Sequence, residues 1–458
     1  MKSILFIIPW SGFYIGRKES HFADEPERAP EGVVGLASYL SNKGASVRIA
    51  DMQQMLRYNS GDDVKTLSDL WTICQTFKPD IVGFSFFTAR FKYAKDIFDY
   101  LTQCYDTEKK PLMIAGGVHP TLLPRETLSE IPFDALIIGE GEIPLLQLLK
   151  GIDYHNIKGF FTADSEKAEK ADVITNLDNL PFPDWSLIDI DFYNRPSHQI
   201  SNTVLHRVMP ITFGRGCNYR CNFCAHNCFL FARCHSAEYF IDKMRHVERQ
   251  CGVKTFIIQD SSIGNFRKVW EEVCNILIEN GTPYQWWANL RVNQVDEDFL
   301  KLLKRAGCIK LFFGFESGSP RILEKMNKRI TVEQCRKAAE LCHKIGLNFY
   351  ASFIINYFGE TEEDLLLTEQ LIRETRPTSL AINRFSPVPG SVDFDNNANI
   401  IMPHINSIED WTTLGMLNFK MLMGDMTEER YKYWEKHLRS LKKYINSHES
   451  DTKQPEYQ

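Results

Sequence analysis

The sequence has no long apolar run and no excess of positive charge. No stretch approaches the roughly 18 uncharged apolar residues that a membrane-spanning helix needs, so we expect no membrane span. The apolar run 4–10 is too short for the core of a signal peptide, which favours a first β-strand and a cytoplasmic location. With 53 basic and 59 acidic side chains, the net charge of −6 excludes a nucleic-acid partner held by overall basic charge.

The first part of the chain shows a repeating strand and helix pattern. Its 458 residues are 43% hydrophobic and 24% charged, a composition typical of soluble proteins with about three domains. Continuous apolar strands separated by amphipathic helices predict a Rossmann-like α/β domain over 1–150, with a parallel sheet covered on both faces. The predicted strands are 4–9, 46–51, 81–86, 112–115 and 135–138, and the predicted helices are 31–43, 67–77 and 92–105.

The informative residues of this domain follow the strands directly. Ligands of parallel sheets bind beyond the carboxyl ends of the strands, and glycine pairs there let the backbone approach a ligand closely. Plain tight turns are the alternative explanation of the glycines. No Walker A or Gly-x-Gly-x-x-Gly motif follows the first strand, so a phosphate-binding signature is missing. The candidate ligand contacts are Pro9, Ser85, Thr88, Gly116, Gly117, His119, Gly139 and Glu140.

A second series of strands and helices begins after a proline-rich linker, predicted over 151–205. The strands of residues 206–390 are predicted at 211–213, 255–259, 284–290, 309–315, 349–357 and 379–385. Six strands, against eight in a complete barrel, predict an open, partial (βα)6 barrel of the TIM type, with its site at the carboxyl ends of the strands. Residues 391–458 are expected to form a small helical region, with helices near 407–422 and 426–447 and a disordered tail.

Three cysteines follow the first barrel strand with the spacing Cys217-x-x-x-Cys221-x-x-Cys224. We expect an intracellular chain to keep its thiols reduced, which makes clustered cysteines candidate metal ligands. Three thiolates suit an iron-sulfur cluster with one iron left open. Zinc, as in a zinc-bearing barrel hydrolase, would need a fourth ligand from His226 or Cys228, and the usual second Cys-x-x-Cys pair is absent.

This loop, with Phe223 before its last cysteine and six predicted strands behind it, resembles the radical SAM superfamily. The resemblance implies a 4Fe-4S cluster held by Cys217, Cys221 and Cys224, whose open iron binds S-adenosylmethionine (SAM). It also implies that one electron, from a low-potential donor of the flavodoxin or ferredoxin type, cleaves SAM to a 5′-deoxyadenosyl radical. The protein would then supply the orientation and a dry cavity.

Four further barrel residues are similar to SAM contacts of that superfamily. Asp260 resembles the acidic group for the methionine ammonium, with a helix cap as the alternative. Arg291 resembles the arginine beside the SAM carboxylate or ribose, with a surface ion pair as the alternative. Glu316 and Ser317 stand in a Gly-x-Glu-Ser-Gly-Ser segment, which implies contact with the adenosyl group. Many members of the superfamily carry the segment Gly-x-Pro-Gly-Glu-Thr at the corresponding place. Residues 356–361 here are Asn-Tyr-Phe-Gly-Glu-Thr, so the first Gly and the Pro are absent.

The amino-terminal domain resembles the cobalamin-binding domain of class B radical SAM methyltransferases, through segments 29–40, 116–121 and 139–142. The resemblance implies base-off cobalamin at the edge of the sheet, facing the cluster. The Asp-x-His-x-x-Gly motif that supplies a cobalt ligand elsewhere is absent after the first strand. His119 is therefore a candidate ligand by position, with a structural histidine as the alternative.

The resemblance also indicates a reaction. The commonest role of this branch is methylation of an unactivated carbon or phosphorus, here of a small-molecule biosynthetic intermediate. Some relatives instead cyclise, contract a ring, hydroxylate or dehydrate, with or without cobalamin. A cluster-binding sensor without catalysis is a third alternative. A methylthiotransferase is disfavoured, because that branch carries a second cluster on three amino-terminal cysteines and this domain has only Cys74 and Cys104.

Overall fold

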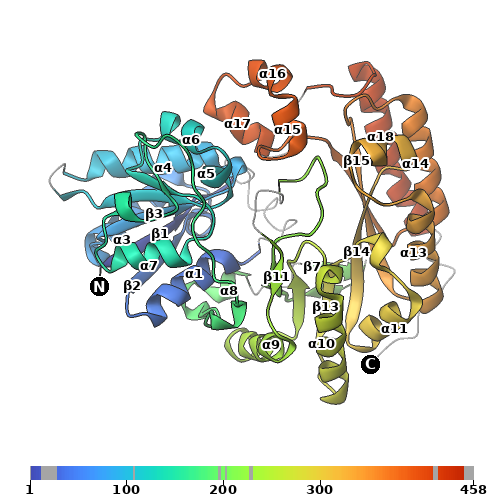
Figure 1. Ribbon diagram of the computed structural model, residues 1–458, viewed down its shortest axis with the longest axis horizontal. Coiled ribbons are helices and arrows are strands. Elements are labelled where there is room, and N and C mark those ends of the chain that lie inside the picture. The colour runs from blue at the N-terminus through green and yellow to red at the C-terminus, as the bar shows by residue number, and fades with distance from the viewer. Residues whose placement is uncertain are drawn as a thin grey trace.

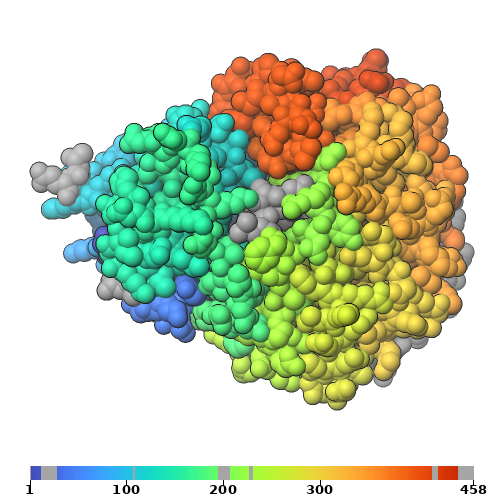
Figure 2. All heavy atoms as spheres, viewed as in Figure 1, coloured from blue at the N-terminus to red at the C-terminus, as the bar shows by residue number. Residues whose placement is uncertain are grey.

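The structure is a computed structural model with two α/β units side by side and a helical region that touches both (Figures 1 and 2). The residues that it describes are 2–11, 28–106, 109–193, 198–201, 204–225, 231–415 and 421–447. No helix among them is both long and apolar enough to cross a membrane.

The amino-terminal unit is built on a six-stranded sheet with the order β2-β1-β3-β4-β5-β6. The strands are β1 Ser3–Ile8, β2 Ser46–Asp51, β3 Ile81–Ser85, β4 Leu112–Gly116, β5 Ala135–Ile137 and β6 Phe160–Phe161. The first five are parallel, which confirms the predicted parallel sheet. The order reverses between β1 and β3, the switch point where doubly wound sheets bind ligands. Antiparallel β6 lies in the segment predicted as linker and was missed, because two residues show no periodicity.

Helices cover both faces of this sheet. On one face α4 (Phe91–Cys104) buries Phe91, Ala94, Phe98 and Leu101, a spacing of three and four residues that gives a helix one apolar side. On the other face α1 and α7 bury a second apolar cluster. The helices are α1 Glu31–Asn42, α2 Met52–Tyr58, α3 Asp63–Phe77, α4 Phe91–Cys104, α5 Val118–Leu122, α6 Pro124–Glu130 and α7 Glu142–Leu149.

The second unit is an open barrel of six parallel strands with the order β16-β15-β14-β13-β12-β9. The strands are β9 Met209–Ile211, β12 Thr255–Ile258, β13 Gln285–Asn289, β14 Cys308–Glu316, β15 Asn348–Ile355 and β16 Ser379–Arg384. The first and last strands lie at opposite ends of the order, which confirms the predicted partial barrel. The helices that cover it are α9 Ala237–Cys251, α10 Arg267–Glu279, α11 Glu297–Arg305, α12 Pro320–Lys325, α13 Val332–Ile345 and α14 Glu362–Thr375.

The segment between the two units has structure of its own. It contains helix α8 (Ile190–Tyr193) and an antiparallel pair, β7 (His198–Ser201) with β8 (Val204–His206). Trp185 of this segment is buried in the same apolar cluster as the barrel strands. The segment is therefore packed as part of the fold, although its irregular sequence predicted only a linker.

The carboxyl-terminal helices join the two units. The helix α17 (Ile408–Gly415) packs against α4 and buries Trp411 and Leu414 in the apolar cluster of the first sheet. The Lys92 N–H donates to Thr412 Oγ1 at 3.1 Å across this contact. These helices are α15 Val392–Asn396, α16 Ala398–Ile401, α17 Ile408–Gly415 and α18 Glu428–Ser447. The predicted disordered tail, 448–458, lies outside the described residues.

The turn before β14 gives a test of the barrel packing. Gly307 has a φ of +96°, and a Cβ there would lie 2.0 Å from the Tyr284 carbonyl oxygen. A side chain at positive φ costs roughly 1–2 kcal/mol, and here a clash with fixed backbone is added. We expect Gly307→Ala to lower the thermal unfolding midpoint, followed by circular dichroism. The control is Gly281→Ala, at φ +58° with open space around it. Equal effects of the two substitutions would contradict the packing of this turn.

Candidate functional site

A cavity of about 830 Å³ lies between the carboxyl edge of the first sheet and the rim of the barrel. The turns after β3, β4 and β5 and the start of α1 line one side of it. Segments 212–216 and 259–261 of the barrel line the other side. Its volume falls within the range of about 300–1,000 Å³ that is usual for ligand sites.

Five of the residues predicted to contact a ligand in the first domain meet in this cavity: Ser85, Gly116, Gly117, Gly139 and Glu140. Gly117 and Gly139 have φ values of +97° and +98°, which favour glycine. A Cβ on Gly117 would lie 3.0 Å from the backbone N and O of Phe86. Neither turn carries a side chain at these positions, so a ligand in the cavity can approach the backbone closely.

Pro9, Thr88 and His119 do not line the cavity. The Pro9 carbonyl accepts a hydrogen bond of 2.7 Å from Arg90, whose side chain does line it. His119 is fully buried, with Nδ1 3.1 Å from Thr88 Oγ1 and its ring centroid 4.0 Å from that of Phe91. Burial lowers the pKa of His119 to about 3 and keeps the imidazole neutral. This placement corresponds to the structural alternative and separates the imidazole from the cavity.

The cysteine loop, residues 217–224, follows the short strand β10 (Gly214–Arg215). This strand pairs in antiparallel fashion with β11 (Arg233–Cys234). Gly216, with φ +87°, turns the chain into Cys217. Cys221 is 7% exposed, whereas Cys217 and Cys224 are half-buried.

The chemistry of this loop fits a cluster. None of the three predicted ligand cysteines is in a disulfide. The pKa of the Cys221 thiol is raised, because burial outweighs the opposing effect of the nearby Lys328 and Arg291 cations. Arg291 Nη1 lies 3.6 Å from Cys221 Sγ. Cations at this distance favour the thiolate that binds metal.

The three thiols share one loop without converging on one point. No three His, Cys, Asp or Glu side chains in the described part of the chain are gathered closely enough to hold a metal ion. The fit to a cluster therefore rests on the donor set and its cationic surroundings. The two extra ligands considered for zinc, His226 and Cys228, lie outside the described residues.

Arg291, Glu316 and Lys328 form a buried charged group beside Cys221. Lys328 Nζ lies 2.6 Å from Glu316 Oε1, and both side chains are less than 10% exposed. The Arg291 guanidinium lies 3.6 Å from the centre of the Tyr219 ring and donates to the Lys328 carbonyl. Arg291 Nε is buried with no partner among the described residues. Such a donor fits an anionic ligand group, as expected for the SAM carboxylate.

Ser317 and Asp260, the other two predicted SAM contacts, have different surroundings. Ser317 is fully buried, and its hydroxyl accepts from the Ser319 N–H at 3.1 Å. Asp260 lines the cavity, and its Oδ1 accepts from the Phe213 N–H at 2.8 Å. Burial raises the pKa of Asp260 to about 7, although the backbone N–H groups of Phe213 and Gly214 oppose the shift. Asp260 therefore faces the first sheet, whereas Arg291 and Glu316 stay beside Cys221.

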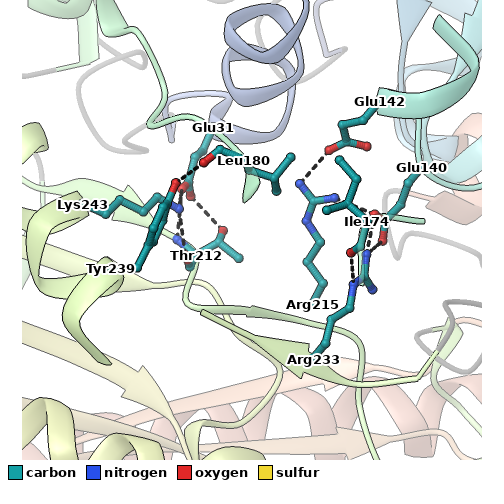
Figure 3. Close-up of polar contacts among 10 residues, drawn as sticks. All are labelled: Glu31, Glu140, Glu142, Ile174, Leu180, Thr212, Arg215, Arg233, Tyr239 and Lys243. Atoms are coloured by element: carbon teal, nitrogen blue, oxygen red, sulfur yellow. Dashed lines mark hydrogen bonds and ion pairs between the residues drawn. The ribbon is translucent and has the colours of Figure 1, made fainter. Parts of the chain in front are cut away.

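The sequence reasoning missed a set of ion pairs that crosses the cavity (Figure 3). Glu140 lies 2.7 Å from Arg215 and 2.5 Å from Arg233, and Glu142 lies 2.8 Å from Arg215. Lys243 of α9 lies 2.7 Å from Glu31, which also accepts from the Thr212 N–H and hydroxyl. The missed residues are Glu31, Glu142, Arg215, Arg233 and Lys243. For Arg215 the sequence did offer a signal, because this residue lies two positions before Cys217.

Comparisons with known families agree with both halves of this site. Residues 28–149 match the B12 binding domain, and residues 211–372 match the radical SAM superfamily. The chain thus joins a B12-binding domain to a radical SAM domain and is a cobalamin-dependent radical SAM enzyme. Its two domains imply a 4Fe-4S cluster, SAM and cobalamin as cofactors.

This chain is similar to a relative named as a methyltransferase and to a relative named as a cyclase. An uncharacterized methyltransferase of Pyrococcus horikoshii is 29% identical over 336 residues, 71% of each chain. The anaerobic magnesium-protoporphyrin IX monomethyl ester cyclase of Rubrivivax gelatinosus is 28% identical over 381 residues, 79% of this chain and 65% of the relative. The radical SAM methyltransferase TsrM from Kitasatospora setae, solved with cobalamin and a 4Fe-4S cluster, has the same fold, with a TM-score of 0.66 at 16% identity over 88% of this chain and 75% of that one.

The buried Glu316–Lys328 pair can be tested by removing one partner. Lys328→Met leaves the Glu316 carboxylate buried and unpaired, a change that costs about 3–5 kcal/mol of unfolding free energy. We expect the urea midpoint to fall accordingly. The control is Arg336→Met, which breaks two pairs of a side chain that is 41% exposed and should cost at most about 1 kcal/mol. Similar losses in both variants would show that the Glu316 site is solvated.

Proposed function

We propose that this protein is a radical SAM methyltransferase that methylates an unactivated carbon or phosphorus of a small-molecule biosynthetic intermediate. The observation that carries the proposal is the shared cavity. One cavity extends from the glycine turns at Gly117 and Gly139 to Arg215 and Gly216, next to Cys217. A cofactor on the first sheet would therefore share a reaction space with the cysteine loop.

In this proposal the predicted residues have separate roles. Cys217, Cys221 and Cys224 would hold the cluster. Arg291, Glu316, Ser317 and Asp260 would hold SAM, and the turns that carry Ser85, Gly116, Gly117, Gly139 and Glu140 would hold cobalamin. Together the three cofactors would supply hydrogen-atom abstraction and a methyl group. Pro9, Thr88 and His119 would support the cobalamin turns from behind.

The chain's own residues would then bind, orient and exclude water. Lys328 Nζ lies 2.6 Å from Glu316 Oε1, so the buried carboxylate has a counter-charge within hydrogen-bond distance. The unpartnered Arg291 Nε offers one donor that is already oriented. Preorganised donors of this kind lose little freedom when they bind, which favours a fixed orientation of the ligand.

Cyclisation without methyl transfer is the second candidate function. The specific observation in its favour is the relative named as a cyclase, which is 28% identical over 79% of this chain. Both candidates need the same cofactor residues, so they differ in the fate of the methyl group of SAM.

We also propose a low-potential electron donor of the flavodoxin or ferredoxin type. Cys217 and Cys224 are half-buried, whereas the buried Cys221 faces Arg291. A cluster held by this loop would therefore have a side near the protein surface.

The cysteine assignment predicts a selective loss of SAM cleavage. Cys221→Ala should abolish formation of 5′-deoxyadenosine and lower the iron content, because one of the three cluster ligands is removed. Cobalamin binding should persist, since its predicted contacts lie on the first sheet. Cys342→Ala is the matched control, because Cys342 is buried in α13 outside the loop. Normal 5′-deoxyadenosine production by Cys221→Ala would disprove the assignment.

The methyl-transfer assignment predicts two products from SAM. With the anaerobically reconstituted protein, hydroxocobalamin and a strong reductant, methyl-labelled SAM should yield S-adenosylhomocysteine as well as 5′-deoxyadenosine. Mass spectrometry measures both. The control is the protein without hydroxocobalamin, which should lose S-adenosylhomocysteine. Formation of 5′-deoxyadenosine alone, with cobalamin bound, would favour the cyclase candidate.

A further inference from the structure

Arg215 ties the base of the cysteine loop to the B12-binding domain. It ends strand β10, and only Gly216 separates it from Cys217. Its Nη1 lies 2.7 Å from Glu140 Oε2 and its Nη2 lies 2.8 Å from Glu142 Oε1 (Figure 3). Glu140 lies in the turn after β5, and Glu142 begins α7. One side chain of the radical SAM domain thus holds two carboxylates of the other domain.

A second arginine, Arg233, contacts the same Glu140 carboxylate as Arg215. Arg215 and Arg233 are directly opposite each other on antiparallel β10 and β11. Like charges in such a pair are destabilising unless a counter-charge lies between them. Glu140 is that counter-charge, because it contacts both guanidinium groups. The strand pair that precedes the cysteine loop therefore depends on a carboxylate of the B12-binding domain.

Glu140 belongs to a turn that faces the cavity, and Glu142 follows this turn at the start of α7. Gly139 and Glu140 line it, and the Gly139 N–H donates to Thr121 Oγ1 at 3.0 Å. Any large ligand at the edge of the first sheet would restrict this turn. Restricting it also restricts Glu140 and Glu142, and thereby Arg215. A group ordered in advance loses less freedom when the next ligand binds.

We propose that Arg215 is a positioning residue through which cobalamin bound at the first sheet strengthens SAM binding at the cysteine loop. The inference rests on the proposed function, which places the cluster on Cys217 and cobalamin in the cavity. Coupling between binding sites is reciprocal, so SAM would strengthen cobalamin binding by the same factor.

The experiment measures the Kd for SAM by anaerobic titration calorimetry of the cluster-loaded protein, with and without saturating hydroxocobalamin. We expect hydroxocobalamin to tighten SAM binding about fivefold or more in the wild type, the usual lower end of coupling between sites. Arg215→Gln should bind the same amount of iron but show no difference between the two conditions. Arg215→Lys keeps the charge and should restore part of the coupling.

Arg267→Gln is the matched control. Arg267 also holds two carboxylates, Glu271 and Asp296, but all three residues belong to the barrel, away from the cavity. The control should keep the wild-type ratio of Kd values. Because a general loss of stability would affect both variants, loss of the ratio in Arg215→Gln alone supports the inference.

Two results would overturn the inference while leaving the proposed function intact. One is a wild type that cleaves SAM but binds it equally well with and without hydroxocobalamin. The other is an Arg215→Gln variant with the full wild-type ratio. If Arg215→Gln does not fold, Glu142→Gln decides, because it retains the contacts of Glu140. In Glu142→Gln the remaining Arg215–Glu140 pair should carry only part of the coupling, so a ratio equal to that of the wild type would then overturn the inference. A wild type that loads iron but does not bind SAM would instead overturn the proposed function.

Discussion

The constraint on which this molecule depends is that the carboxyl ends of the parallel strands of its two sheets face one another across a single cavity. In each sheet the carboxyl ends of the strands lie at one edge, and ligand-binding turns occur there. Here both edges border the same cavity of about 830 Å³. Neither unit encloses it alone, because turns of the first sheet and segments 212–216 and 259–261 of the barrel line opposite sides.

Ion pairs hold these two edges together, and burying their charges costs free energy. Glu31 and Lys243 form an ion pair in contact with Thr212, and each side chain is less than 10% exposed. Removing such charges from water costs several kcal/mol per ion, which the partner and further hydrogen bonds must offset. Glu31 meets this condition, since it contacts Lys243 and both polar groups of Thr212. Buried pairs of this kind favour one arrangement of the two domains, since a shifted interface would leave charges unpaired.

Much of the fold could be predicted from the sequence, because parallel strands buried on both faces form continuous apolar runs. All eleven parallel strands of the two sheets overlap predicted ones. Elements with little periodic signal could not be predicted. The edge strand β6 has two residues, and α5 has five and includes a proline. The segment around Trp185 was predicted as a linker for the same reason, although tertiary packing buries it.

By itself the sequence determined the chemistry that is available: three cysteines on one loop after a strand, glycine turns at the ends of parallel strands, and acidic and basic residues at the barrel rim. These signals are local, so spacing along the chain is enough to find them. Only the tertiary structure decided which residues meet. It placed Glu140 and Asp260 in one cavity, and it placed His119 within an aromatic core. It also joined Arg215 to Glu140, 75 residues away in sequence, because contacts across a domain interface leave no periodic pattern in the chain.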